Sequence, residues 1–201
     1  MACVRRRNRL LDRRVCVRDA TLIVIATEGE KDEPQYFEMF KHGQTHFQLV
    51  ILQTGADHAS APQKVLERLD RFAKEYQIGG GDELWYVGDV DRWPVRNLAS
   101  VCRQCVQKGY HWAISNPAFE CWIYLHFDEP DATMHTAGDF VAALREKLGG
   151  YRKGHLPTER LRPCVPAAIA RARSLDTPPA ERLPRMPGSH VYKLVEKLGT
   201  P

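Results

Sequence analysis

A short apolar run near the start of the 201-residue chain does most to limit the folds open to it. Residues 21–26 read Thr-Leu-Ile-Val-Ile-Ala, and Thr27, Glu28, Gly29 and Glu30 follow directly. The run is rich in β-branched residues and too short for a buried helix, which is typical of a central strand covered on both faces. Gly29 permits a sharp turn off the strand. We therefore expect Glu28 at the carboxyl edge of a sheet, where open α/β sheets bind ligands.

A second strand with an acidic end follows in the sequence. Residues 83–87 predict a strand, and Asp89 and Asp91 come just after it. In an extended chain, residues two apart point their side chains the same way. Neighbouring carboxylates resist joint ionisation unless a cation lies between them, and Mg²⁺ is commonly held by one or two carboxylates together with substrate phosphates. Glu28, Asp89 and Asp91 therefore predict a site for Mg²⁺ or Mn²⁺.

The spacing of apolar residues predicts alternating strands and helices with short links. Strands are expected at 21–26, 47–53, 83–87 and 110–114, and helices from 32, over 61–76 and 97–108, and from 117 with Asn116 as its N-cap. This alternation indicates an α/β fold with a parallel sheet of about four strands between helices. Later helices are expected at 140–148, in the second half of 158–174 and at 189–198, with an aperiodic, proline-rich segment at 175–188. We divide the chain into a basic arm (1–18), an α/β core (19–134) and a helical C-terminal extension packed on the core (135–201).

The charge distribution is uneven, although the formal net charge is only +4. Arginines crowd residues 1–18, and a second basic zone covers residues 151–173. Basic flanks around an acidic centre suit a polyanion that is held by its phosphates and cut at a metal ion. A solvated arm and ordinary solvated helix faces would give the same composition, so the two interpretations stay open.

The compartment is predicted from what the sequence lacks. No apolar stretch approaches the roughly 20 residues that span a bilayer, and the first apolar run is short and has no small-residue cleavage site behind it. We therefore expect a cytoplasmic protein with no membrane contact. Its six cysteines are then expected as reduced thiols.

Other polar residues have weaker claims to a function. Glu33 is expected to be a solvated carboxylate at a helix start, and Glu120 is either a surface residue or a functional one. Cys102 and Cys105 resemble half of a zinc site, but no second pair follows at the spacing of a zinc finger. Buried thiols are the better interpretation. His126 and His190 are expected more often as packed or exposed imidazoles than as site residues.

Several longer motifs resemble one protein family. They are residues 23–37 (IVIATEGEKDEPQYF), 115–127 (SNPAFECWIYLHF), the Asp89–Asp91 pair between them, 151–153 (YRK) and 191–198 (VYKLVEKL). Together they are similar to the motifs of RloB-like proteins, which belong to the Toprim superfamily. The resemblance implies a parallel sheet between helices, Glu28 as the Toprim glutamate and Asp89 and Asp91 as the metal-binding pair. It also implies that Glu120 is a further ligand or substrate-positioning group.

The chain departs from the family pattern at a few positions. Asp32 stands where the family usually has threonine, and Ala118 where it often has cysteine. Residues 187–190 read Pro-Gly-Ser-His in place of Asn-Pro-Ser-Thr. None of these changes removes one of the acids.

The residues and the resemblance together predict a Mg²⁺- or Mn²⁺-dependent nuclease of DNA or RNA, with tRNA among the candidates, that acts in anti-phage defence. The predicted catalytic residues are Glu28, Asp89, Asp91 and Glu120, of which the first three hold the metal. The predicted nucleic-acid contacts are Lys31, Arg152, Lys153 and Arg160. The alternative is a non-catalytic component that binds nucleic acid or an associated protein of a defence system.

Overall fold

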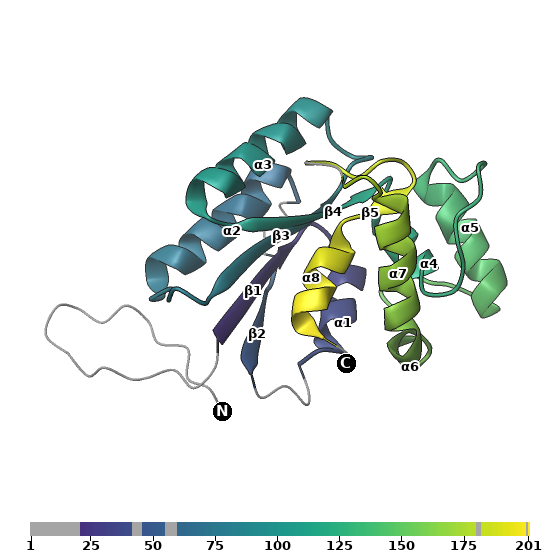
Figure 1. Ribbon diagram of the computed structural model, residues 1–201, viewed down its shortest axis with the longest axis horizontal. Coiled ribbons are helices and arrows are strands. Elements are labelled where there is room, and N and C mark those ends of the chain that lie inside the picture. Colours follow the sequence, from purple (N-terminus) through teal and green to yellow (C-terminus); the bar gives the residue numbers. More distant parts are fainter. Residues whose placement is uncertain (1–20, 42–45, 55–59, 180–181, 200) are drawn as a thin grey trace, which may run out of the picture.

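The structure is a computed structural model that describes residues 21–41, 46–54, 60–179, 182–199 and 201. Its described part contains one sheet of five strands in the order β2-β1-β3-β4-β5, with helices on both faces (Figure 1). The parallel strands are β1 (Thr21–Thr27), β2 (Phe47–Leu52), β3 (Glu83–Asp89) and β4 (His111–Asn116). The α/β class and the four parallel strands are confirmed. The predicted arm at 1–18 lies outside the described residues.

A fifth strand corrects the prediction of a purely parallel sheet. β5 (Gly188–Ser189) pairs antiparallel with β4, with Ser189 opposite Ser115. The Ser115 and Ser189 hydroxyls are 2.9 Å apart and hydrogen-bonded. Two residues are too few to show any strand periodicity, so this strand had no signal in the sequence and forms only because β4 offers it an edge.

Alternating side chains on the strands divide the core into two layers. Val24, Tyr86 and Ile114 point to one face and pack against α2 (Pro62–Glu75) and α3 (Val95–Lys108). Ile25 and Val87 point to the other face. That face is covered by α1 (Asp32–Glu38), α4 (Phe119–Tyr124), α5 (Ala137–Leu148), α7 (Val165–Leu175) and α8 (Val191–Leu198), with α6 (Thr158–Leu161) and a 3₁₀ turn (Arg162–Cys164) before α7. Figure 1 shows the two helical layers on opposite sides of the sheet.

The strand order places a topological switch point between β1 and β3. The chain leaves β1 through α1 on one face to reach β2, then returns through α2 on the opposite face to β3, on the other side of β1. In open α/β sheets, the crevice outside the carboxyl ends of two such strands is where ligands bind. The register aligns Thr27 with Val87, and the Glu28 amide donates to the Val87 carbonyl at 2.9 Å. Glu28 and Asp89 therefore leave the sheet side by side.

The helix predicted from Pro117 begins later than expected. α4 starts at Phe119 with Ala118 as its N-cap, and the Asn116–Pro117 peptide is cis. The Asn116 side chain donates instead to the Pro184 carbonyl at 3.0 Å. The Pro117 carbonyl accepts from the amides of Val90 and Asp91. Asn116 and Pro117 therefore bond to the C-terminal segment and to the loop after β3 instead of capping the helix. The local sequence gives no indication of these distant contacts.

Two later helix starts also differ from the prediction. α5 begins at Ala137 because Thr136 and Asp139 form a capping box, in which each side chain bonds the other residue's amide. α8 begins at Val191 because Ser189 belongs to β5. The segment predicted as aperiodic at 175–188 gives its first residue to α7 and its last to β5, and its described residues in between, 176–179 and 182–187, contain no helix or strand.

Residues after 135 share one apolar core with the sheet. Phe140, Leu161, Val165 and Leu194 belong to the same buried cluster as Ile25 of β1. The division of the chain at residue 134 stays a prediction. Within the described residues, no helix combines the length and apolarity that a membrane span requires.

Candidate functional site

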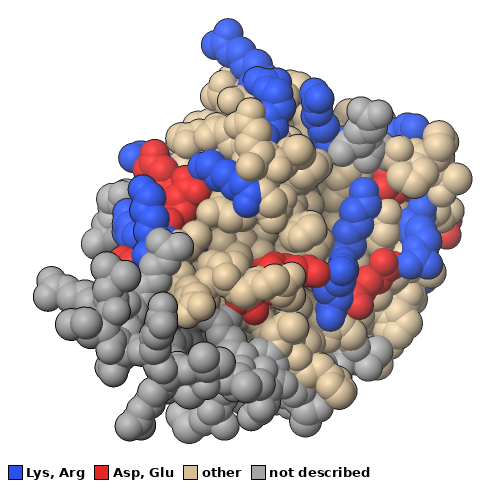
Figure 2. All heavy atoms as spheres, turned by 60° about the vertical axis from the view of Figure 1, so that its left-hand side comes forward, with Lys and Arg blue, Asp and Glu red and all other residues tan. Residues whose placement is uncertain are grey.

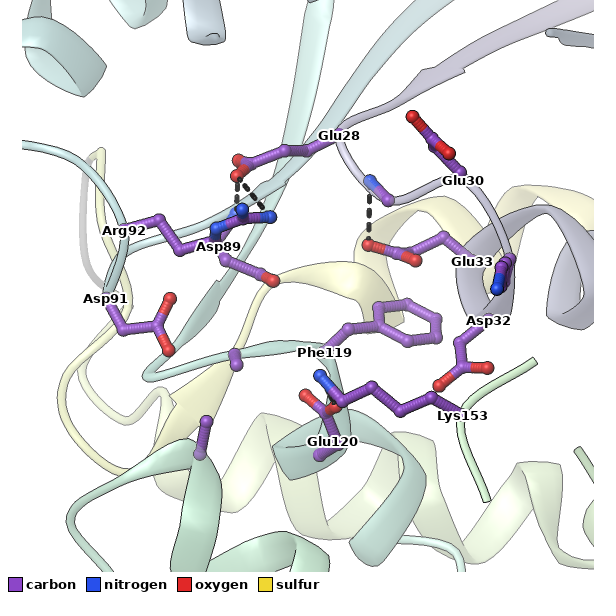
Figure 3. A pocket seen from close by; sticks show the side chains of 14 residues that line it. Glu28, Glu30, Asp32, Glu33, Asp89, Asp91, Arg92, Phe119, Glu120 and Lys153 are labelled. Carbon is purple, nitrogen blue, oxygen red and sulfur yellow. Dashed lines mark hydrogen bonds and ion pairs between the residues drawn. The ribbon is translucent and has the colours of Figure 1, made fainter. Parts of the chain in front are cut away.

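A cavity of about 480 Å³ lies at the carboxyl ends of β1 and β3 (Figure 3). Its walls come from the β1–α1 turn, the loop after β3, the start of α4 and the loop after α5. The lining residues are Glu28, Gly29, Glu30, Lys31, Asp32, Glu33, Asp89, Asp91, Arg92, Ala118, Phe119, Glu120, Ala137 and Lys153. The four residues predicted as catalytic thus line one pocket, although they are up to 92 positions apart in the sequence (28 to 120).

Glu28 is held in place from three sides. Its side chain is 1% exposed, and the Trp93 indole donates to Oε1 at 2.7 Å. The Asp89 amide donates to Oε2 at 3.4 Å, and the Arg92 guanidinium lies 3.8 Å from Oε1. Burial raises the pKa of Glu28, and these three partners oppose part of that rise. The carboxylate is therefore oriented before any ligand arrives.

Asp89 carries the least satisfied group of the pocket. It is 9% exposed, and its Oδ1 is buried without a hydrogen-bond partner. Burial raises the pKa of Asp89 well above its usual range, and the nearby carboxylates of Glu33, Glu28 and Glu120 raise it further. A buried polar atom without a partner is costly and calls for an explanation such as a bound ion. Asp89 lines a pocket that is built mostly from other charged residues, several of them acids.

Asp91 differs from Asp89 in its environment. β3 ends at Asp89, and the chain then turns, because the Val90 amide bonds to the carbonyls of Ser115 and Pro117. A bend at Val90 thus replaces the extended backbone that was expected between the two aspartates, and both still line the pocket. Asp91 is exposed at its rim. Burial of its carboxyl and the charge of Glu120 raise the pKa of Asp91, whereas the charges of Arg92 and Lys153 lower it.

Two further glutamates, Glu33 and Glu120, line the pocket together with Glu28, Asp89 and Asp91, and we call these five residues the acidic wall. The prediction of a solvated Glu33 is wrong, since this residue is 6% exposed. Its Oε1 accepts from the Gly29 amide at 3.0 Å, and a Cβ on Gly29 would lie 1.9 Å from Oε2, so a side chain at position 29 would displace the Glu33 carboxylate. Burial, together with the charges of Asp32, Glu120 and Glu28, raises the pKa of Glu33 to about 7. Glu120, left open by the sequence, is buried in the first turn of α4 and lines the pocket.

The cations of the pocket are Lys31, Arg92 and Lys153. Lys153 forms an ion pair with Glu120. Burial acts to lower the pKa of Lys153, but the bond to Glu120 and the charges of Asp32 and Asp89 outweigh it and raise the pKa. The sequence motifs did not indicate a role for Arg92 or Trp93. Only their position directly after Asp91 could have suggested that they belong to the site.

The other two predicted nucleic-acid contacts lie away from the pocket lining. Arg152 is exposed. Arg160 donates to the carbonyls of Leu148 at 3.1 Å and Lys147 at 3.3 Å, and its guanidinium lies 5.9 Å from the centre of the Phe127 ring. Arg160 therefore ties α6 to the end of α5. On the described part of the face in Figure 2, Lys and Arg side chains stand in separate groups with Asp and Glu beside several of them, rather than in one continuous band.

The histidines and cysteines considered above are packed in the core. His126 is 2% exposed and bonds to the Tyr36 hydroxyl at 3.1 Å, and burial lowers its pKa to about 4. His190 is 1% exposed and contacts Asp176 at 3.2 Å. Burial raises the pKa of Cys102 to about 11 and that of Cys105 to about 12, so both remain thiols. The four cysteines within the described residues are free.

The donor set of the pocket fits a hard cation. Among the described residues, no group of three or more His, Cys, Asp or Glu side chains is arranged to hold a metal ion. Glu28 and Glu120 are turned toward Trp93, Arg92 and Lys153 instead. Mg²⁺ needs only one or two carboxylates besides water and phosphate oxygens, and the lining contains no thiol or imidazole to favour a softer ion. Among the buried carboxylate oxygens of the lining, Oδ1 of Asp89 is the potential metal ligand that lacks a hydrogen-bond partner.

Fold and site together define an α/β protein whose acidic pocket opens at the switch point of a mostly parallel sheet. The family model described as RloB-like protein matches residues 23–198, and the chain belongs to that family. No curated protein and no solved structure matches the chain.

Proposed function

We propose that this protein is a Mg²⁺- or Mn²⁺-dependent nuclease that hydrolyses phosphodiester bonds in DNA or RNA, with tRNA among the candidate substrates. The observation that supports it best is that Asp89, which lines a pocket of acids at the switch point, has a buried Oδ1 atom without a hydrogen-bond partner. A structural carboxylate in a core would be expected to have both oxygens bonded.

Five residues of the pocket receive roles in this proposal. Glu28, Asp89 and Asp91 would hold the cation, the first two as buried carboxylates and the third from an exposed position. When bound, the cation supplies an activated water and neutralises charge on the scissile phosphate. Glu28 also acts as the general acid or base. Arg92 and Lys153, whose side chains are 59% and 64% exposed, bind the phosphate oxygens.

The finer parts of the proposal rest on the motifs that resemble RloB-like proteins. We assign a Toprim-like core to the chain, because a glutamate directly after β1 and two aspartates at and just after the end of β3 line one pocket at the edge of the sheet. We also propose a cytoplasmic role in anti-phage defence, with an associated defence protein as a partner. Phage challenge of cells with and without the intact gene tests this role separately from the chemistry.

The chemistry is tested by incubating the protein with plasmid, single-stranded DNA and total tRNA in Mg²⁺, Mn²⁺ or EDTA. We expect cleavage of at least one substrate with a divalent ion and none with EDTA. Asp89→Asn with Asp91→Asn should abolish cleavage and leave nucleic-acid binding intact. Asp128→Asn, which changes a surface carboxylate that pairs with Lys147, is the matched control and should cleave normally. Full activity of the double variant would contradict the assignment.

One observation favours a second candidate function, a non-catalytic component that binds nucleic acid or an associated defence protein. Glu28 and Glu120 already pair with Arg92 and Lys153, and the described residues include no preformed metal cluster. Binding that weakens with salt, with no cleavage under Mg²⁺ or Mn²⁺, would support this function over the nuclease.

A further inference from the structure

Asp32 uses both of its carboxylate oxygens to hold the loop between α5 and α6. The Tyr151 hydroxyl donates to Oδ2 at 2.6 Å, and the Gly154 amide donates to Oδ1. Asp32 and Tyr151 are each 7% exposed. The carboxylate is thus committed to a segment about 120 positions later in the chain, and its oxygens already have partners, unlike Oδ1 of Asp89.

The two bonds bracket Lys153 closely. Tyr151 and Gly154 are anchored to Asp32, so only Arg152 and Lys153 lie between the anchors. Gly154 has a φ of +83°, and a Cβ there would lie 3.0 Å from Cδ of Lys31, so the loop passes close to the start of α1. One turn further along α1, Gln35 Oε1 accepts from the Leu156 amide at 2.9 Å.

The anchored backbone directs the Lys153 side chain into the pocket. In Figure 3, Lys153 extends below Asp32 to Glu120. A lysine side chain has a flexible four-carbon stem and loses entropy when it is held in one place. Fixing its backbone on both sides reduces the positions that the ammonium can take. Arg152, next to it in the sequence, does not line the pocket.

We infer that Asp32 is a positioning residue that acts through Lys153 and sets this ammonium where it meets a phosphate of the bound nucleic acid. The inference rests on the proposed function, because it takes Lys153 as a phosphate contact. It assigns to Asp32 a role other than that of the metal-binding acids, although it lines the same pocket.

Because Asp32 is charged, the direction in which its removal changes the affinity for nucleic acid distinguishes between its possible roles. Asp32 is an anion in a pocket for a polyanion, so its removal alone should strengthen binding of nucleic acid. If Asp32 positions Lys153, its removal should weaken binding instead. If Asp32 only stabilises the start of α1, its removal should lower the stability of the fold. Any loss of binding would then not depend on Lys153. The two roles separate in a double-mutant cycle, because effects through a shared partner are not additive.

The experiment measures binding of fluorescently labelled single-stranded DNA and of total tRNA, in EDTA, over a range of salt concentrations. Asp32→Ala and Lys153→Ala should each weaken binding about 5- to 10-fold, and each should reduce the slope of log affinity against log salt by about 1. The combined variant should bind no more weakly than Lys153→Ala alone. Glu159→Ala removes an exposed carboxylate of α6 that does not line the pocket, and it should bind as well as the wild type.

Two milder variants test the inference even if Asp32→Ala fails to fold. Thermal unfolding of every variant shows whether it is folded. Tyr151→Phe removes only the hydroxyl that bonds Asp32, and Asp32→Asn keeps an acceptor for the Gly154 amide. Each should weaken binding less than Asp32→Ala, and neither should weaken it further when Lys153 is already alanine.

The possible outcomes separate this inference from the proposed function. Stronger binding by Asp32→Ala, or additive losses in the combined variant, would overturn the positioning role while wild-type cleavage stands. Normal binding by Lys153→Ala would overturn it too. If the wild-type protein neither binds nor cleaves any of the substrates, the proposed function fails first and the inference fails with it.

Discussion

The buried carboxyl of Glu33 should make the stability of the metal-free protein depend on pH. Its pKa is about 7 in the folded protein, against 4.5 for an unperturbed glutamate. Between these values the folded protein keeps a proton that the unfolded chain has lost. Folding stability that is fully present below pH 4.5 is therefore lost as the pH rises through 7. Glu33→Gln removes this dependence, because glutamine has no charge to gain.

The size of the effect follows from the shift. One pKa unit corresponds to about 1.4 kcal/mol, so the full titration is worth about 3 kcal/mol, of which about 2 kcal/mol falls between about pH 5 and pH 8. For a domain of this size, about 2 kcal/mol moves the melting temperature by roughly 4–8 °C. Glutamine has the shape of glutamate and still offers Oε1 to the Gly29 amide. The variant should thus gain stability relative to the wild type as the pH rises.

Urea and thermal unfolding in EDTA from pH 5 to pH 8 measure this difference directly. Wild type and Glu33→Gln should approach one another near pH 5 and separate by about 2 kcal/mol near pH 8. Glu146→Gln, at an exposed position on α5, should give a curve parallel to the wild type. If the Glu33→Gln curve is also parallel to the wild type, Glu33 does not titrate as its burial requires, and the account of the acidic wall is wrong.

Two further substitutions test how the strand ends support the pocket. Gly88→Ala would place a Cβ 2.5 Å from the Tyr86 hydroxyl and should cost about 1–3 kcal/mol in urea unfolding, whereas Gly80→Ala meets nothing within 4 Å and should change stability by less than about 0.5 kcal/mol. Trp93→Phe removes the donor that orients Glu28 and should raise the Mg²⁺ concentration for half-maximal cleavage about 10-fold or more, with little change in melting temperature. An unchanged Mg²⁺ requirement would mean that Glu28 does not bind the ion.

Local pattern was sufficient to predict most of the sheet. The apolar run at 21–27 and the strands at 47–52 and 83–89 lie within a residue or two of the predicted bounds. Strand identity depends on the alternation and branching of neighbouring side chains, which the sequence contains directly. The meeting of Glu28 with Asp89 also followed from the sequence, because the carboxyl ends of parallel strands share one edge of a sheet.

Only the tertiary structure decided how each charged residue of the site is used. Glu33 was expected in water, but the turn at Gly29 and the neighbouring acids enclose it. Arg152 and Lys153 are adjacent and both carry cationic side chains, yet only Lys153 lines the pocket. The sequence by itself determined the strands and the acids at their ends, since these depend on near neighbours. Burial and pairing depend on contacts between segments up to about 120 positions apart, such as that of Asp32 with Tyr151, and nothing in local sequence encodes them.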